Sequence, residues 1–144
     1  MLDLELKNKD LKFGFANEKN LLNDVNVKYP DTIKRIEQYS HFDFRNDTLK
    51  IDFELKSRRI YKGKYNTIFF AECKLLDGRE RMKKGITEKV IYVFNFEDEK
   101  TKNRDVWYWE DDGSDLEITM CGNYRRGDKA KRLANVPINK LKKF

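Results

Sequence analysis

The strongest constraint on the fold is the strict alternation of apolar and polar residues in two neighbouring segments. His41–Arg45 and Leu49–Lys56 both alternate, and Arg45–Thr48 between them is rich in turn-forming residues. Successive side chains of a strand point to opposite faces, so this pattern predicts a β-hairpin with one buried face. The residues expected to form that core layer are Phe42, Phe44, Ile51, Phe53 and Leu55.

The other periodic segments predict an α/β domain with a central mixed β-sheet and flanking helices. Asn17 is expected to cap the start of a short helix, and Thr32–Tyr39 fits either a second helix or an extended lead-in. With no repeat or linker-like segment, residues 1–144 are expected to form one domain. The remaining expected elements are a buried helix face at Leu21, Leu22 and Val25, a third strand at Tyr65–Phe70, a helix at Glu72–Lys84, strands at Val90–Phe96, Val106–Trp109 and Leu116–Met120, and an edge element at Val136–Ile138.

The distribution of charge favours a polyanionic partner. The net charge is +6, and bases from Lys56 to Lys64 are interleaved with Tyr61 and Tyr65, whereas acid collects in Glu97–Glu117. Such segregation is what a phosphate-binding face would need. For any single cluster, solvated surface lysines remain an equally good interpretation.

Several classes of protein do not fit the sequence. Two isolated cysteines, Cys73 and Cys121, suit neither a disulfide framework nor a zinc site. Residues Met1–Glu5 lack the features of a signal peptide, and no apolar stretch is long enough to span a bilayer. We therefore expect a soluble protein that is not secreted and has no membrane association.

Acidic residues and a lysine from two adjacent strands share the face opposite the predicted core layer. Asp52, Glu54 and Lys56 point the same way on one strand, and Asp43 joins them from the other. Clustered carboxylates repel one another unless a cation compensates them. Hard carboxylate oxygens suit Mg²⁺, and a lysine beside them could orient water or stabilise charge in a transition state.

These residues resemble a known family. Asp43, a hairpin and then Glu54-Leu55-Lys56 look like the signature of PD-(D/E)XK, or restriction-endonuclease-like, nucleases. Lys56-Ser57-Arg58 and the later Tyr65-Asn66-Thr67 are similar to segments of small viral and phage members. Glu18, in an Asn-Glu-x-x-Leu-Leu context, is similar to the helical acid that many members use beside the metal. The chain departs from the signature at Phe42, which stands in place of the proline that many members also lack, and at Asp52, which shares the face of Glu54 and competes for the ligand role.

The resemblance implies a restriction-endonuclease-like core and a Mg²⁺ site, with Mn²⁺ as a substitute. The implied metal ligands are Glu18, Asp43, Glu54 and the Leu55 carbonyl. Lys56 would position the attacking water, and it completes the implied catalytic set with Glu18, Asp43 and Glu54.

Other polar residues near the site have more than one interpretation. Arg58 continues the Glu54 face and is the best phosphate-contact candidate, followed by Lys62 and Lys64. Asp52 is interpreted as a solvated acid or one that supports the ligands. Lys74 could approach the site from beyond the third strand, but it is interpreted as a surface lysine. The lone histidine, His41, could contact metal, water or phosphate, but it is interpreted as structural. The aromatic pair Trp107 and Trp109 is also interpreted as structural, and Asp111 and Asp112 as turn residues.

The leading hypothesis is metal-dependent hydrolysis of DNA by an endonuclease. The alternative is a catalytically inactive nuclease-like module that binds nucleic acid or forms part of a virus or phage particle. Basic RNA-binding proteins are a weaker fit because no aromatic RNA-binding motif is present. The expected setting is the cytoplasm or nucleus of a host cell, or a virion, and cutting both strands of a duplex would call for a homodimer.

Overall fold

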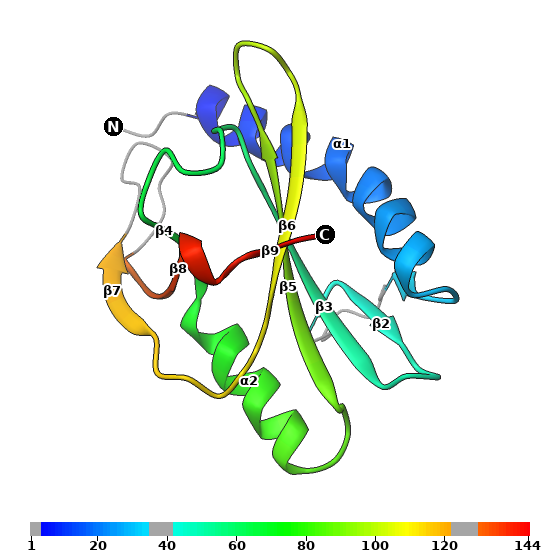
Figure 1. Cartoon of the computed structure of the whole chain (residues 1–144). Coiled ribbons are helices and arrows are strands. Elements are labelled where there is room, and N and C mark those ends of the chain that lie inside the picture. Colours follow the sequence, from blue (N-terminus) through cyan, green and yellow to red (C-terminus); the bar gives the residue numbers. More distant parts are fainter. Residues whose placement is uncertain (1–3, 35–41, 122–129) are drawn as a thin grey trace.

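The computed structural model describes residues 4–34, 42–121 and 130–144, and these residues form an α/β fold (Figure 1). The helices are α1 (Leu4–Lys28) and α2 (Glu72–Lys83), with a short 3₁₀ helix η2 (Ile138–Lys140). The strands are β1 (Ile33–Lys34), β2 (Phe44–Asn46), β3 (Ile51–Arg58), β4 (Thr67–Ala71), β5 (Lys89–Glu97), β6 (Arg104–Glu110), β7 (Glu117–Cys121), β8 (Lys131–Pro137) and β9 (Lys142–Lys143).

The strands form two sheets. The larger has the order β1-β2-β3-β5-β6-β9, in which β3 and β5 are parallel and the other neighbours are antiparallel. The smaller is antiparallel, with the order β4-β8-β7. A mixed central sheet with flanking helices is therefore confirmed. The strands expected near Tyr65–Phe70 and Leu116–Met120 form, but they belong to the second sheet, because alternation within a strand does not specify its partner.

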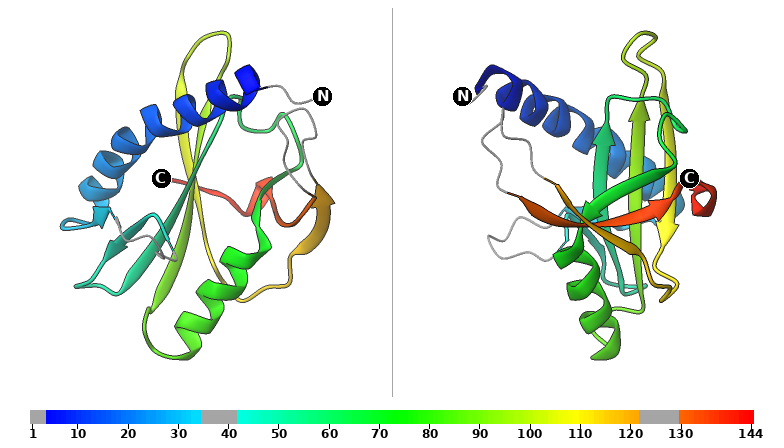
Figure 2. Two further views of the ribbon diagram at one scale, coloured as in Figure 1. Left: turned by 180° about the vertical axis from the view of Figure 1, so that it is seen from behind. Right: turned by 90° about the vertical axis from the view of Figure 1, so that its left-hand side faces the viewer.

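The larger sheet is covered on both faces. Helix α1 lies along one face, and α2 and the smaller sheet lie on the other (Figures 1 and 2). In β5, Ile91 and Val93 pack on the α1 side, whereas Val90, Tyr92 and Phe94 pack on the α2 side. The nearly continuous apolar run in β5 is explained by this central position, since such strands are buried on both faces.

The expected start of the first helix is wrong. Helix α1 begins at Leu4, and Asn17 lies inside it, buried, with its Oδ1 atom accepting a hydrogen bond of 3.3 Å from Asn95 Nδ2. Asparagine favours helix caps because its side chain competes for backbone groups, but here a tertiary contact holds the side chain instead. The buried helix face is confirmed at Leu21 and Val25, and Leu22 is half-buried beside them.

The predicted hairpin is confirmed, but its core layer needs one correction. Strands β2 and β3 pair from Asn46↔Ile51 to Phe44↔Phe53. Phe44 and Phe53 pack under α1, whereas Phe42 packs on the α2 side near Tyr92, with 6.5 Å between ring centroids. Residues 42–43 form a bend before β2, so the side-chain alternation does not extend to Phe42.

Two further expectations need correction or completion. Val136 and Pro137 end β8, which is the middle strand of the smaller sheet and not an edge, and Pro137 stands at its last position opposite Thr67. Of the ambiguous segment Thr32–Tyr39, only Ile33–Lys34 is a described strand, and residues 35–41 lie outside the described residues.

The cysteines Cys73 and Cys121 are exposed and form no disulfide. No helix in the described part of the chain has the length and apolarity needed to cross a membrane.

Candidate metal and nucleic-acid site

The carboxylate of Glu54 is buried in the middle of β3. The residue is 3 % exposed and faces the α2 side of the sheet. Lys56 Nζ lies 3.4 Å from its Oε1, and Lys74 Nζ, from α2, lies 3.7 Å from its Oε2. Among the described residues, Oε2 has no hydrogen-bond donor although it is buried. A buried acceptor left in this state is costly, so this position needs an explanation.

Asp43 lies at the point where β2 stops pairing with β3. Its Oδ2 atom accepts a hydrogen bond of 2.9 Å from the backbone N–H of Leu55. The last described backbone pair of the two strands is Phe44↔Phe53, so the carboxylate satisfies an N–H that the bend at residues 42–43 leaves without a backbone acceptor. Asp43 is thereby held beside Glu54, as the sequence predicts.

The proximity of these two acids changes the acidity of Glu54. Burial, and secondly repulsion from Asp43, raises the pKa of Glu54 to about 7, although the ammonium groups of Lys56 and Lys74 oppose the change. Any further positive charge near such a carboxylate would stabilise its ionised form. The two lysines compensate it only in part.

Asp52, two residues before Glu54, has a different environment. It is 2 % exposed, so the expectation of a solvated acid is wrong. Its two oxygens accept hydrogen bonds from Arg45 Nη1 at 2.9 Å and Arg81 Nε at 2.8 Å. Because two guanidinium groups already bind its carboxylate, Asp52 has a structural role. It does not compete with Glu54 for a metal cation.

Glu18 is ion-paired elsewhere in the structure. Its Oε1 lies 3.2 Å from Lys34 Nζ, in a cavity of about 210 Å³ that Leu22 and Phe44 also line on the α1 side of the sheet. Within the described ranges, no three His, Cys, Asp or Glu residues are close enough together to hold a metal ion. Glu18 lies on the α1 side of the larger sheet and the Glu54 carboxylate on the α2 side, so leaving Lys34 would not by itself bring Glu18 to the metal shell. A role for Glu18 in that shell stays a prediction.

The residues at Glu54 nevertheless fit a magnesium ion. Mg²⁺ keeps several waters and is commonly held by one or two carboxylates together with substrate phosphates. Asp43 and Glu54 provide two such groups, and the unsatisfied Glu54 Oε2 gives the fit its physical basis.

Lys74 lies at the site, whereas the sequence favoured the interpretation of a surface lysine. It lies on α2, eighteen residues after Lys56, and its ammonium also lies 5.5 Å from the centroid of the Phe42 ring. The available signal was its position in the first turn of a helix that follows a strand directly. Only the packing of α2 against the sheet shows that this turn reaches Glu54.

The three predicted phosphate-contact residues lie against aromatic rings. The Arg58 guanidinium is 5.1 Å from the Phe69 ring centroid, and its Nη2 donates to the Phe69 carbonyl at 3.1 Å. Lys62 Nζ is 3.7 Å from the Trp107 centroid, and Lys64 Nζ is 5.6 Å from that of Tyr65. These distances are typical of cation–π contacts.

The remaining predicted residues are structural or undescribed. Trp109 is buried in the core and Trp107 packs against it, as expected. Asp111 is 9 % exposed and forms an ion pair with Arg79 at 3.1 Å, which gives it a larger structural role than a turn residue has. His41 lies outside the described residues.

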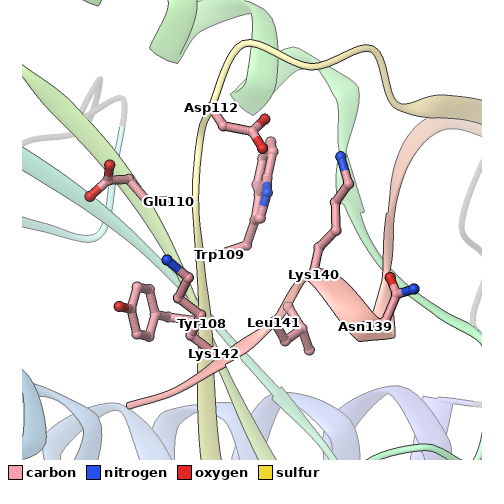
Figure 3. A pocket seen from close by; sticks show the side chains of 8 residues that line it. All are labelled: Tyr108, Trp109, Glu110, Asp112, Asn139, Lys140, Leu141 and Lys142. Carbon is pink, nitrogen blue, oxygen red and sulfur yellow. The ribbon is translucent and has the colours of Figure 1, made fainter.

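A larger cavity, of about 380 Å³, lies beside β6 and the C-terminal segment (Figure 3). Its charged lining residues are Glu110, Asp112, Lys140 and Lys142, and Lys142 lies beside Tyr108 on the side opposite Lys140. None of the predicted site residues lines this cavity. It is separate from the candidate site at Glu54.

Comparisons of the chain with models of protein families, with curated proteins and with solved structures find no match.

Proposed function

We propose that this protein is a Mg²⁺-dependent nuclease that hydrolyses phosphodiester bonds in DNA. The observation that carries the proposal is the Glu54 carboxylate, which is buried against a second acid and has one oxygen that no described residue supplies with a hydrogen-bond donor. A fold has no structural need for such a group, since burial of an unsatisfied carboxylate beside another acid destabilises it. Binding of a divalent cation would convert this unfavourable arrangement into a favourable one.

Each residue of the site has a distinct role in this proposal. Asp43 and Glu54 hold the metal ion, which would act as a Lewis acid toward a phosphoryl oxygen and increase the acidity of water. Lys56, about 3.4 Å from Glu54, is placed to orient the attacking water and to stabilise charge that develops on the phosphate. Lys74 adds a second ammonium on the same carboxylate, and Arg58 lies two residues beyond Lys56 for contact with the backbone of the nucleic acid.

The order of acid, hairpin, Glu-x-Lys and basic–aromatic segment supports the same proposal through its resemblance to PD-(D/E)XK nucleases. The mixed sheet with a helix on each side is compatible with that family at the level of an α/β fold.

A second candidate function is a nuclease-like module without catalytic activity. Two observations favour it. Glu18 is paired with Lys34, and the described residues contain no group of three metal-ligating side chains. In such a module, Lys56 and Lys74 would serve as permanent counter-charges for Glu54, and the basic residues would bind nucleic acid or a component of a virus particle.

Cleavage assays separate the two functions. Single-stranded DNA, duplex DNA and RNA are incubated with the protein in Mg²⁺, in Mn²⁺ and in EDTA. The nuclease proposal expects cleavage of DNA that requires metal. Lys56→Ala should reduce the rate by about 100-fold or more, as the loss of a group that stabilises the transition state does, with DNA affinity and melting temperature nearly unchanged. The matched control is Lys100→Ala, in the exposed turn before β6.

Metal binding provides the second readout. Calorimetric titration with Mn²⁺ should show binding by the wild type and weaker binding by Glu54→Gln and Asp43→Asn. If no nucleic acid is cleaved and these two variants bind Mn²⁺ as the wild type does, the inactive module is the correct function.

A further inference from the structure

The segment between the two acids Glu54 and Glu72 has an unusual composition. It contains five basic residues and no acidic residue, and residues 129–144 are the other long stretch of the chain with bases and no acid. It also exposes three large aromatic side chains, with exposed fractions of 56 % for Tyr61, 59 % for Tyr65 and 39 % for Phe69. Lysine and arginine side chains suffice for contact with phosphates, so the exposed aromatic rings need a separate explanation.

A tight turn gathers the two tyrosines. The backbone N–H of Lys64 donates to the Tyr61 carbonyl at 3.2 Å, and Gly63 within this turn has a φ of 92°. A turn that closes in this way brings its first and fourth residues within about 7 Å, so Tyr61 lies close to Lys64 and the adjoining Tyr65. The exposed rings of Tyr61 and Tyr65 therefore belong to one short stretch of surface, with Lys64 Nζ 5.6 Å from the Tyr65 ring centroid.

The surface is attached firmly to the rest of the fold. Lys62, inside the turn, lies over the half-buried ring of Trp107 on β6. At the start of the segment, Arg58 donates to the Phe69 carbonyl on β4 and lies over the Phe69 ring. The exposed rings are therefore held by elements of both sheets, and little order has to be gained when a ligand binds.

We propose that Tyr61, Tyr65 and Phe69 form a stacking surface for the bases of single-stranded DNA, with Lys64 and Arg58 on its phosphates. This inference rests on the proposed nuclease function and assigns the substrate class of the same site. Aromatic side chains bind single strands because every unpaired base offers a flat face, whereas the faces of bases in a duplex are covered by their neighbours. Strand β3 runs from Glu54 to Arg58, so a single strand held here would lead along Arg58 and Lys56 to the carboxylates.

Binding in EDTA tests this inference without cleavage. Fluorescence anisotropy measures the affinity of the full chain for three labelled ligands of equal length: a thymidine single strand, a single strand of abasic residues, and a duplex. The abasic strand has the same phosphates but no bases. The double variant Tyr61→Ala with Tyr65→Ala should lose about 10-fold or more in affinity for the thymidine strand, since stacking contributes about 1–3 kcal/mol per base. Its affinity for the abasic strand and the duplex should change less than about twofold.

Two control variants guard against trivial explanations. Replacing both tyrosines with phenylalanine keeps the rings and should keep the affinity for the thymidine strand. Leu76→Ala removes an equally exposed apolar side chain, 57 % exposed on α2, and should change nothing. Thermal melting of each variant checks that the fold is intact.

Three results would overturn the stacking surface: equal losses for all three ligands, no loss for the thymidine strand, or equal binding of polyglutamate that is lost in the same variants. The outcome is separable from the nuclease proposal. Selective loss of single-strand binding without any cleavage refutes the nuclease alone, and metal-dependent cleavage with no effect of the tyrosines refutes the stacking surface alone.

Discussion

Asp52 and Glu54 are neighbouring acids on the same face of β3, both nearly fully buried, yet their surroundings differ sharply. Asp52 accepts hydrogen bonds from two arginines at 2.8–2.9 Å. Glu54 has two lysines at 3.4 and 3.7 Å and one oxygen with no hydrogen-bond donor in the described part of the chain. Burial, and secondly repulsion from Asp43, raises its pKa to about 7.

The difference teaches that burial of an acid does not by itself indicate a functional site. Guanidinium groups match a carboxylate with two directed donors, and they fix the geometry of Asp52. Lysine ammonium groups are compact charges on flexible stems, and at Glu54 they leave room for another partner. Strand β3 therefore carries Asp52, whose carboxylate is paired with two arginines, and Glu54, whose carboxylate is paired only in part.

Removing Asp52 should have the largest effect on stability. Asp52→Ala removes a buried carboxylate from the buried Arg45 and the half-buried Arg81 and should cost about 3–5 kcal/mol of the free energy of unfolding. Urea denaturation measures the loss. The matched control is Asp47→Ala, which removes an exposed ion-pair partner of the same Arg45 and should cost less than about 1 kcal/mol. A small loss for Asp52→Ala would mean that the two arginines do not stabilise the fold through Asp52, and the contrast with Glu54 would then fail.

Removing the charge of Glu54 should increase the free energy of unfolding above neutral pH, which is the opposite of the effect at Asp52. Its pKa is 4.5 ordinarily and about 7 in the folded protein, so the folded state holds this proton more tightly than the unfolded chain does. The contribution of Glu54 to the free energy of unfolding is therefore fully present below pH 4.5. It declines as the pH rises to about 7, by roughly 3 kcal/mol in total. Glu54→Gln removes the decline. In EDTA, urea denaturation should give similar stabilities at pH 4.5 and a more stable variant at pH 8, whereas parallel pH curves would show that Glu54 is adequately compensated.

Two substitutions of Asp43 separate its two effects, which are the hydrogen bond with the Leu55 N–H and the repulsion on Glu54. Asparagine can still accept the Leu55 N–H, but alanine cannot, and both relieve the repulsion on Glu54. Asp43→Ala should therefore be less stable than Asp43→Asn by about 1–2 kcal/mol, the cost of an unsatisfied backbone donor. Hydrogen exchange at Leu55 should be faster in the alanine variant. Equal stability and equal exchange would remove the structural role of Asp43.

Lys74 should give the smallest effect. Lys74→Met retains much of the side-chain stem but removes one compensating charge, so the pKa of Glu54 should rise further above about 7. The cost above neutral pH should be below about 1 kcal/mol, because the ammonium is at a partly exposed position. Carboxyl-carbon NMR titration of Glu54 measures the change in its pKa. A lower pKa in this variant would mean that Lys74 does not interact favourably with Glu54.

The sequence predicts the local part of this arrangement well. Alternation predicts that Glu54 and Lys56 share a face and that a hairpin brings Asp43 beside them, because both follow from the period of a strand and a short connection. The burial of Asp52 and the approach of Lys74 could not be predicted in this way. They depend on how α2, which follows β4, docks on the sheet, and neither the pairing of β4 with β8 nor that docking is specified by a local pattern.

Helix α1 illustrates a different limit. Asn17 has the chemical preferences of a cap, and its distant partner Asn95 is what allows it inside the helix. Phe42 shows a third limit, since a two-residue bend suffices to transfer a side chain from one core to the other.

The parallel pairing of β3 with β5 has a consequence for the order in which the chain acquires its chemistry. Glu54 stands opposite Tyr92, thirty-eight residues later, whereas its neighbours in β2 are reached through a short loop. During synthesis the hairpin can therefore form long before β5 and α2 exist, and loop closure over such a separation is slow compared with hairpin formation. Until those later elements dock, Glu54 remains in water, without the burial that is the main cause of its raised pKa. The acid becomes unusual only when the sheet is complete, so an unfinished chain carries the residues of the candidate site without its buried carboxylate.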